Sequence, residues 1–75
     1  MDLNDFVKNF AEQFEDIDPS EISPDTEYQD LEEWSSLTAM SIIALVKIEY
    51  GKTVTGREVR QAKTVRELYE LIASK

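Results

Sequence analysis

Hydrophobic side chains recur along the start of the chain at the spacing of one helix face. Steps of three and four residues place side chains on the same side of an α-helix, and the polar residues between them fall on the other side. The pattern therefore predicts an amphipathic helix over about residues 3–16, with an aromatic-rich face turned to the core. The face consists of Leu3, Phe6, Val7, Phe10, Phe14 and Ile17.

Two prolines interrupt this pattern. The residue before a proline is pushed out of the α region, so Asp18-Pro19 and Ser23-Pro24 predict an irregular segment. A long acidic loop then extends to about Trp34. Long loops in small domains are usually functional or tethered, and we expect hydrophobic anchors within this one. The expected anchors are Ile22, Tyr28 and Leu31.

A second helix is predicted from Ser35, whose hydroxyl can cap the next turn, to Tyr50, after which Gly51 can end it. Residues 36–50 contain neither proline nor glycine, and the helix is apolar almost all round. One apolar face holds Ile42, Ile43, Val46 and Tyr50, and a nearly opposite face holds Leu37, Met40, Ala44 and Ile48. Two interpretations remain open: a central helix packed on both sides, or a helix with one face kept for a partner.

The last third of the chain predicts two more helices. A short third helix is expected over residues 54–62, with Gly56 near its start. Thr64 and Glu67 have the spacing of a capping box, which opens a final helix. Its apolar stripe consists of Val65, Leu68, Tyr69 and Ile72. With no strand-like alternation, the sequence predicts an all-α fold: a four-helix bundle with a long first loop and a short third helix, as a single domain over residues 1–75.

Composition removes several classes of chemistry. The 75 residues include no Cys and no His, so the chain offers no disulfide, thiolate nucleophile, Cys/His zinc site or imidazole base. Residues 16–30 contain no glycine, unlike an EF-hand calcium loop, so we expect no metal site. The acidic side chains are expected to be solvated rather than paired for acid–base catalysis. We therefore expect a protein that is not an enzyme, and a hydrolase is the least supported alternative.

The net charge of -8 is unevenly distributed. Twelve of the sixteen acidic residues lie in residues 1–34, and seven of the eight basic residues lie in residues 35–75. Acidity argues against nucleic acid as a partner, because phosphate backbones are bound by clusters of Lys and Arg. No apolar run reaches the length of a membrane span, and the first five residues do not resemble a signal peptide. We therefore expect a cytoplasmic location.

Two hydroxyls stand at the start of the predicted second helix, in the run Trp34-Ser35-Ser36-Leu37. Ser35 is expected to cap the helix. Ser36 would occupy the first helical position, beside unpaired backbone amides that stabilise a phosphate. Without a histidine Ser36 is a poor nucleophile, but the residues permit it to be an acceptor that another enzyme modifies.

In length, acidity and order of elements, the sequence resembles the acyl carrier protein family over essentially all 75 residues. The signature of that family is Asp-Ser-Leu at the start of the second helix of a four-helix bundle, and the corresponding residues here are Ser35-Ser36-Leu37. Further similar segments are Ile42-Ile43-Ala44-Leu45-Val46, Glu49-Tyr50-Gly51, and Thr64-Val65 through Leu71-Ile72.

The resemblance implies that Ser36 carries a covalent 4'-phosphopantetheine arm, transferred from coenzyme A by a separate Mg²⁺-dependent phosphopantetheinyl transferase. The thiol of the arm would hold acyl, aminoacyl or hydroxyacyl groups as thioesters, as in fatty acid biosynthesis and other lipid metabolism. A monomeric carrier would then present them to acyl-loading and acyl-transferring enzymes. An internal cavity, whose size depends on packing of Ile43, Val46 and Val59, would hold the acyl chain.

The sequence also departs from the family. Where the family commonly has Leu-Gly-x-Asp-Ser-Leu, this chain has Leu31-Glu32-Glu33-Trp34-Ser35-Ser36-Leu37. The aspartate before the acceptor is replaced by Ser35, the glycine is missing, and a tryptophan is added. We expect Trp34 either to seal the loop onto the bundle or to stand beside the arm.

The usual docking face of the family, acidic on helices two and three, is apolar and partly basic here, with Arg57 and Arg60 on the third helix. We therefore expect a specialised pathway with its own partner enzymes. Four residues, Leu37, Met40, Ala44 and Ile48, are expected to bind the partner, and Asp30, Glu32 and Glu33 to steer its approach. The alternative is a carrier-like helical interaction module that is never modified, which the replacement of the aspartate by Ser35 keeps open.

Overall fold

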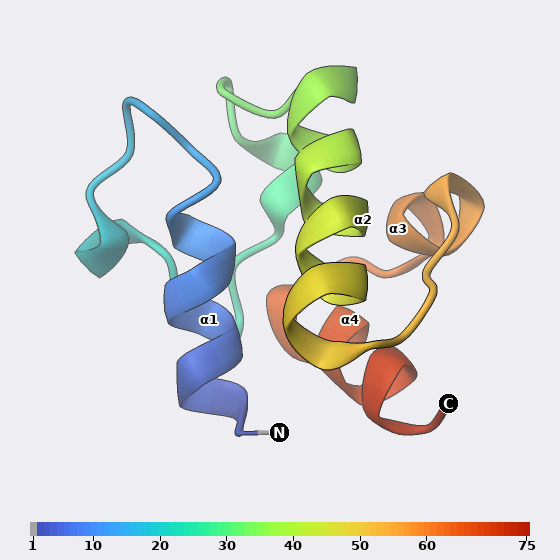
Figure 1. Ribbon diagram of the computed structural model, residues 1–75. Helices are drawn as coiled ribbons and strands as arrows, with labels where there is room; N and C mark the ends of the chain where they lie inside the picture. The colour runs from blue at the N-terminus through green and yellow to red at the C-terminus, as the bar shows by residue number, and fades with distance from the viewer. Residues whose placement is uncertain (1) are drawn as a thin grey trace.

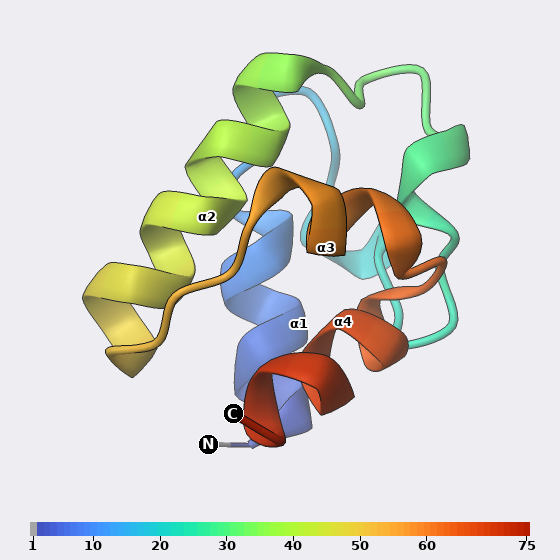
Figure 2. The same ribbon diagram turned by 90° about the vertical axis from the view of Figure 1, so that its right-hand side faces the viewer.

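Four helices and two short 3₁₀ turns make up the computed structural model, which describes residues 2–75. The helices are α1 (Leu3–Ala11), α2 (Ser36–Tyr50), α3 (Gly56–Gln61) and α4 (Val65–Ala73), and the 3₁₀ turns are η1 (Pro19–Glu21) and η2 (Tyr28–Asp30). Helices α1 and α2 run antiparallel, α3 lies beside α2, and α4 crosses the lower part of the bundle (Figures 1 and 2). The predicted all-α bundle with a long first connection and a short third helix is confirmed.

Helix α1 is shorter than predicted. It ends at Ala11 rather than near residue 16, and two i→i+3 bonds, from Gln13 N–H to the Phe10 carbonyl and from Phe14 N–H to the Ala11 carbonyl, tighten the chain into a turn. Phe14 and Ile17 are nevertheless buried, as the stripe predicted. Hydrophobic spacing identifies residues that face the core, but it does not distinguish a last helical turn from an irregular turn with the same side-chain direction.

The ends of α2 agree with prediction. Ser35 is the N-cap, and its hydroxyl accepts a hydrogen bond from the Thr38 N–H. Gly51 ends the helix in the left-handed conformation, at φ 65°, and its N–H donates to the carbonyl of Lys47. Glycine suits this position because it has no Cβ to clash there.

Helix α3 begins later than predicted. Val54 is buried but precedes the helix, and the extended Thr55 caps a helix whose first residue is Gly56. The Thr55 hydroxyl accepts from the Glu58 N–H at 3.1 Å, and the Glu58 carboxylate accepts from the Thr55 N–H at 3.0 Å. The Thr-x-x-Glu spacing of this capping box is present in the sequence, but only the one at Thr64 was predicted. Thr64 does cap α4 as predicted.

Tyr28 and Gln29 hold the long first connection against α3. The buried Tyr28 hydroxyl lies within hydrogen-bond distance of the carbonyls of Val59 and Ala62. The Gln29 amide donates to the carbonyl of Arg60 at 2.8 Å and to that of Ala62 at 2.9 Å. The connection is thereby tied to the end of α3, which confirms Tyr28 as an anchor.

The rest of the connection is tied to α4. The Thr26 carbonyl accepts from the first helical N–H of α4, that of Val65, at 3.2 Å, and the Pro24 carbonyl accepts from Arg66 at 2.8 Å. Ile22 is buried as predicted, and Leu31 is half-buried against the core. The long loop is therefore an ordered part of the fold.

All four helices and the first connection contribute to one core, and every buried side chain among residues 2–75 is apolar or aromatic. The core consists of Phe6, Phe10, Ala11, Phe14, Ile17, Ile22, Tyr28, Ile42, Leu45, Val46, Val54, Val59, Ala62, Val65, Leu68 and Ile72. Among the residues described, no helix combines the length and apolarity that crossing a membrane requires.

Candidate attachment and docking site

Ser35 and Ser36 differ in what their hydroxyls do. The Ser35 oxygen accepts from Thr38 N–H at 3.3 Å and lies 3.2 Å from the Thr38 hydroxyl. Ser36 is the first residue of α2, is exposed, and has no side-chain hydrogen bond to any of residues 2–75. One hydroxyl thus stabilises the helix end, whereas the other is exposed and makes no bond within residues 2–75.

The backbone around Ser36 suits an anion. The first intrahelical bond of α2 is the one from Ala39 N–H to the Ser35 carbonyl, so the N–H groups of Ser36 and Leu37 precede the helical ladder. Together with the helix dipole, these donors stabilise negative charge at the first turn. A phosphodiester on Ser36 therefore fits the residues that surround it.

Trp34 packs against the aromatic core. Its ring is stacked on Phe10, with centroids 6.5 Å apart and an interplanar angle of 5°, and its centroid lies 4.8 Å from that of Tyr28. Phe14 completes the cluster at 6.3 Å. These contacts favour the interpretation that Trp34 seals the connection onto the bundle just before α2, which fixes the position from which α2 starts.

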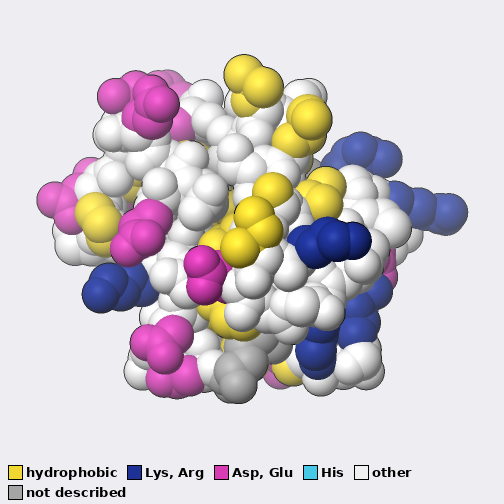
Figure 3. Space-filling model, in the orientation of Figure 1, with side chains coloured by type: hydrophobic (Ala, Val, Ile, Leu, Met, Phe, Trp, Pro, Cys, Tyr) yellow, Lys and Arg dark blue, Asp and Glu magenta, His cyan; other side chains and the backbone are white. Residues whose placement is uncertain are grey.

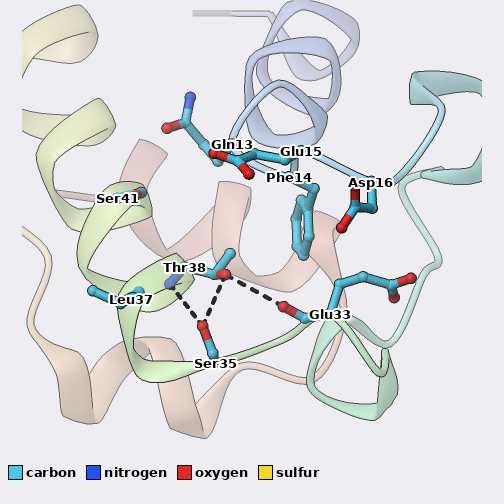
Figure 4. A pocket seen from close by; sticks show the side chains of 9 residues that line it. All are labelled: Gln13, Phe14, Glu15, Asp16, Glu33, Ser35, Leu37, Thr38 and Ser41. Carbon is cyan, nitrogen blue, oxygen red and sulfur yellow. Dashed lines mark hydrogen bonds between the residues drawn. The ribbon is translucent and has the colours of Figure 1, made fainter.

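A surface pocket of about 330 Å³ lies between α2 and the turn that follows α1, and its lining includes Ser35 and Leu37 but not Ser36. Figure 4 shows the side chains that line it: Gln13, Phe14, Glu15, Asp16, Glu33, Ser35, Leu37, Thr38 and Ser41. A second pocket of about 300 Å³ shares Gln13 and Ser41 with the first, and so continues it along α2. It is further lined by Ala44, Leu45, Ile48 and Glu49. We call the two pockets together the α2 groove.

Sequence reasoning missed the residues that the turn after α1 contributes to this groove, namely Gln13, Glu15 and Asp16. They are far from α2 in sequence and belong to the irregular turn that follows the end of α1 at Ala11, where a continued helix was expected. Ser41 could have been found, since it lies four residues after Leu37 and therefore on the same face of α2.

The outer face of α2 is open. Leu37 is 76% exposed, Met40 64% and Ile48 78%, and Ala44 is also exposed. We call these four residues the apolar stripe. The opposite face is packed, with Ile42 and Val46 fully buried. The interpretation of α2 as a central helix packed on both sides is therefore wrong, because no element covers the stripe within residues 2–75.

The three acidic residues expected to steer partners are all exposed, but they do not line one site. Glu33 lines the α2 groove, whereas Asp30 lines a different pocket together with Arg60 and Lys63 of the α3 side. Figure 3 shows the surface in the same orientation as Figure 1: acidic side chains gather over α1 and the first connection, hydrophobic ones over α2, and basic ones towards α3. The apolar stripe thus lies between surfaces of opposite charge.

Among residues 2–75, no three carboxylates are grouped so that they could hold a metal ion. Val46 and Val59, expected to border an acyl cavity, are fully buried, and none of the pockets described above or on the α3 side is lined by them.

Comparison with known families agrees with this geometry. The family model described as phosphopantetheine attachment site matches residues 5–72. The chain therefore belongs to the phosphopantetheine-binding carrier family, as the resemblance to acyl carrier proteins predicted, and the group that this family attaches covalently is 4'-phosphopantetheine. A carrier domain of this family interacts with enzymes. Neither a search of curated proteins nor a search of solved structures returned a match.

Proposed function

We propose that Ser36 is the attachment serine and that the chain carries acyl, aminoacyl or hydroxyacyl groups in a specialised pathway. The observation that carries the assignment is the contrast between two neighbouring serines in a chain of the phosphopantetheine family. The Ser35 hydroxyl is used as the helix cap, whereas the Ser36 hydroxyl is exposed and unbonded within residues 2–75.

At the phosphorus atom, attachment forms one P–O bond and breaks another. The Ser36 oxygen bonds to the phosphorus of coenzyme A that carries the pantetheine, and the bond from that phosphorus to the rest of the nucleotide breaks. Adenosine 3',5'-bisphosphate leaves, and the hydroxyl proton passes to a base of the transferase, since this chain has no histidine near Ser36. When bound, the group supplies a thiol that holds acyl groups as thioesters, which a chain without cysteine lacks.

Intact-mass measurement tests the assignment. Purified chain is incubated with coenzyme A, Mg²⁺ and a broad-specificity phosphopantetheinyl transferase. The wild-type mass is expected to rise by one phosphopantetheinyl group, and the mass of Ser36→Ala to stay unchanged. Ser35→Ala is the matched control, since it removes the neighbouring hydroxyl and is expected still to be loaded. A wild-type chain that gains no mass would refute the proposal.

We further propose that partner enzymes bind the apolar stripe, with Asp30, Glu32 and Glu33 steering their approach. The stripe lies next to Ser36 and is uncovered within residues 2–75, and exposed apolar patches rimmed by charge are typical of protein interaction sites. Ordinary fatty acid synthesis enzymes, which recognise acidic carriers, are expected to use this chain poorly. Equal turnover of this chain and an acidic carrier by such enzymes would contradict the specialised partner set.

The competing function is an unmodified helical interaction module in the cytoplasm. The exposure of Leu37 and Ile48 favours it, because such a surface could bind a protein without any arm. The mass measurement separates the two functions, since only a carrier gains the arm.

A further inference from the structure

The α2 groove starts at the residues that flank Ser36, although Ser36 itself does not line it. Ser35 and Leu37, its two neighbours in sequence, line the first pocket, and Ser41 leads into the second. We propose that this groove, between α2 and the turn after α1, is the resting site of the pantetheine arm. The proposal rests on the proposed attachment at Ser36 and deepens it, because it states where the arm lies when no partner is bound.

The first part of the groove matches the middle of the arm. Its wall contains the amide of Gln13 and the hydroxyls of Thr38 and Ser41. A pantetheine arm carries amide groups and a hydroxyl, which need hydrogen-bond partners when they leave water. Phe14 and Leu37 add apolar surface for the methyl groups of the arm. The lining thus combines polar and apolar groups as the ligand does, and its three carboxylates, those of Glu15, Asp16 and Glu33, are exposed to water.

The second part of the groove matches the end of the arm. Ala44, Leu45 and Ile48 line it, and Ile48 is 78% exposed. A thiol and the first carbons of an acyl group are apolar and gain free energy by covering such a surface. An arm at rest would therefore shield part of the apolar stripe from water.

The length of the arm agrees with the length of the groove. With the bond-to-span ratio of an extended peptide chain, the arm reaches about 15 Å from its phosphate to its sulfur. Helix α2 rises by about 7.5 Å from Ser36 to Ser41 and by about 18 Å from Ser36 to Ile48. The sulfur of an extended arm thus falls beside Ala44 and Ile48, in the apolar part of the groove.

The α3 side of the molecule offers a poorer fit. The pocket there is lined only by polar and charged side chains: Glu27, Gln29, Asp30, Arg60, Gln61 and Lys63. Val46 of α2 and Val59 of α3 are fully buried in the core. An arm turned to that side would find no open apolar surface in this pocket for its thiol end.

A spin label on the arm gives a direct test. The chain has no cysteine, so the thiol of the loaded carrier is unique and accepts a nitroxide without any mutation. Paramagnetic broadening of the amide signals is expected to be strongest at Gln13, Ser41, Ala44 and Ile48, and weak at Gln61 and Lys63. Broadening that is equal on both sides of α2, or strongest on the α3 side, would overturn the proposal.

A groove-filling variant gives a second readout on unlabelled protein. Ser41→Leu fills the junction of the two pockets, and Gln61→Leu adds the same side chain to the pocket on the α3 side as a control. The thiol of loaded wild type is expected to react with iodoacetamide about fourfold more slowly than that of Ser41→Leu, since covering one methylene equivalent shifts an equilibrium by about that factor. The Gln61→Leu rate is expected to match wild type.

The outcomes remain separable from those of the proposed function. Intact mass is read first, and a chain that gains no arm refutes the attachment at Ser36, and the groove assignment with it. A chain that is loaded, but whose thiol reacts equally fast in wild type, Ser41→Leu and Gln61→Leu, overturns only the groove assignment. Circular dichroism of each variant confirms that it is folded before the rates are compared.

Discussion

At the scale of single residues, the proposed attachment site is distinguished by the different surroundings of two neighbouring serines. Ser35 gives its oxygen to the Thr38 N–H, and this bond orders the first turn of α2. Ser36 is then presented at a helix end whose backbone N–H groups favour an anion. The family uses aspartate at the capping position, and this chain keeps the cap while losing its charge. Helix capping can therefore continue here without the acidic residue.

Ser35→Ala is expected to lower the free energy of unfolding by about 1 kcal/mol, because it removes the N-cap. Ser36→Ala is expected to change it by less than about 0.5 kcal/mol, since the exposed hydroxyl makes no bond within residues 2–75. Urea unfolding of both variants checks the difference. Equal destabilisation by the two substitutions would contradict the assignment of the cap to Ser35 alone.

The burial of Tyr28 predicts that the stability of the fold decreases at alkaline pH. Burial, with a smaller contribution from the charge of Glu67, raises the pKa of the Tyr28 phenol well above its ordinary value of 10.0. The folded state thus favours the neutral phenol. The contribution of this preference to the free energy of unfolding is fully present below pH 10 and is lost as the pH rises above it. Urea midpoints at pH 8 and pH 11 are expected to show a larger loss for wild type than for Tyr28→Phe.

Tyr28→Phe is also expected to be less stable than wild type below pH 10, where the phenol is neutral. Tyr28→Phe removes the donor to the carbonyls of Val59 and Ala62, which is expected to lower the free energy of unfolding by about 1–2 kcal/mol at pH 8. A variant as stable as wild type at pH 8 would show that the phenol does not hold the connection to α3.

At the scale of elements, each helix is limited by local signals. Thr55 and Thr64 cap α3 and α4, and Gly51 ends α2 in a conformation that other residues adopt only with strain. These limits set where the turns begin. The turn after α1 and the start of α2 together create the groove beside Ser36.

Gly51→Ala is expected to lower the free energy of unfolding by about 1 kcal/mol, because alanine at φ 65° is strained even though a Cβ there would meet no atom within 4 Å. Gly56→Ala is the matched control: it lies inside the first turn of α3, has no positive φ, and its Cβ would have an ordinary contact of 3.5 Å with Arg60. It is expected to leave stability unchanged or to raise it by up to about 1 kcal/mol. Thermal unfolding of both variants measures the contrast, and an equal loss in both would contradict it.

Sequence patterns predicted the helices better than their ends. Ser35 and Gly51 carry strong local signals, so the bounds of α2 were correct. Helix α1 was placed too long, because Phe14 continues the apolar spacing after the helix has ended. The Thr55 cap was available from the sequence and was missed, whereas the approach of Gln13 to Ser41 depends on tertiary packing and leaves no local pattern.

At the scale of the whole molecule, charge and hydrophobicity are segregated. Acidic side chains lie over α1 and the first connection, basic ones lie towards α3, and the apolar stripe separates them (Figure 3). A partner that covers the stripe would also cover part of the α2 groove, since Leu37, Ala44 and Ile48 belong to both. Docking and release of the arm would then be coupled.

The charged and the apolar residues of the docking surface are expected to affect the rate of loading by a phosphopantetheinyl transferase in different ways. Glu33→Gln is expected to slow loading at low ionic strength and to have little effect at high salt, since exposed charges are screened. Leu37→Ala is expected to slow loading at both ionic strengths, because apolar contacts are not screened. Rates that depend on salt equally in both variants would contradict a docking surface whose affinity is apolar.

The most direct test of attachment at Ser36 is to locate the added group by fragmentation mass spectrometry of the loaded chain. We expect a phosphopantetheinyl group on Ser36 and an unmodified Ser35, and loading of Ser36 also in the Ser35→Ala variant. A group on Ser35, or a chain that accepts none under conditions that load another carrier, would contradict it.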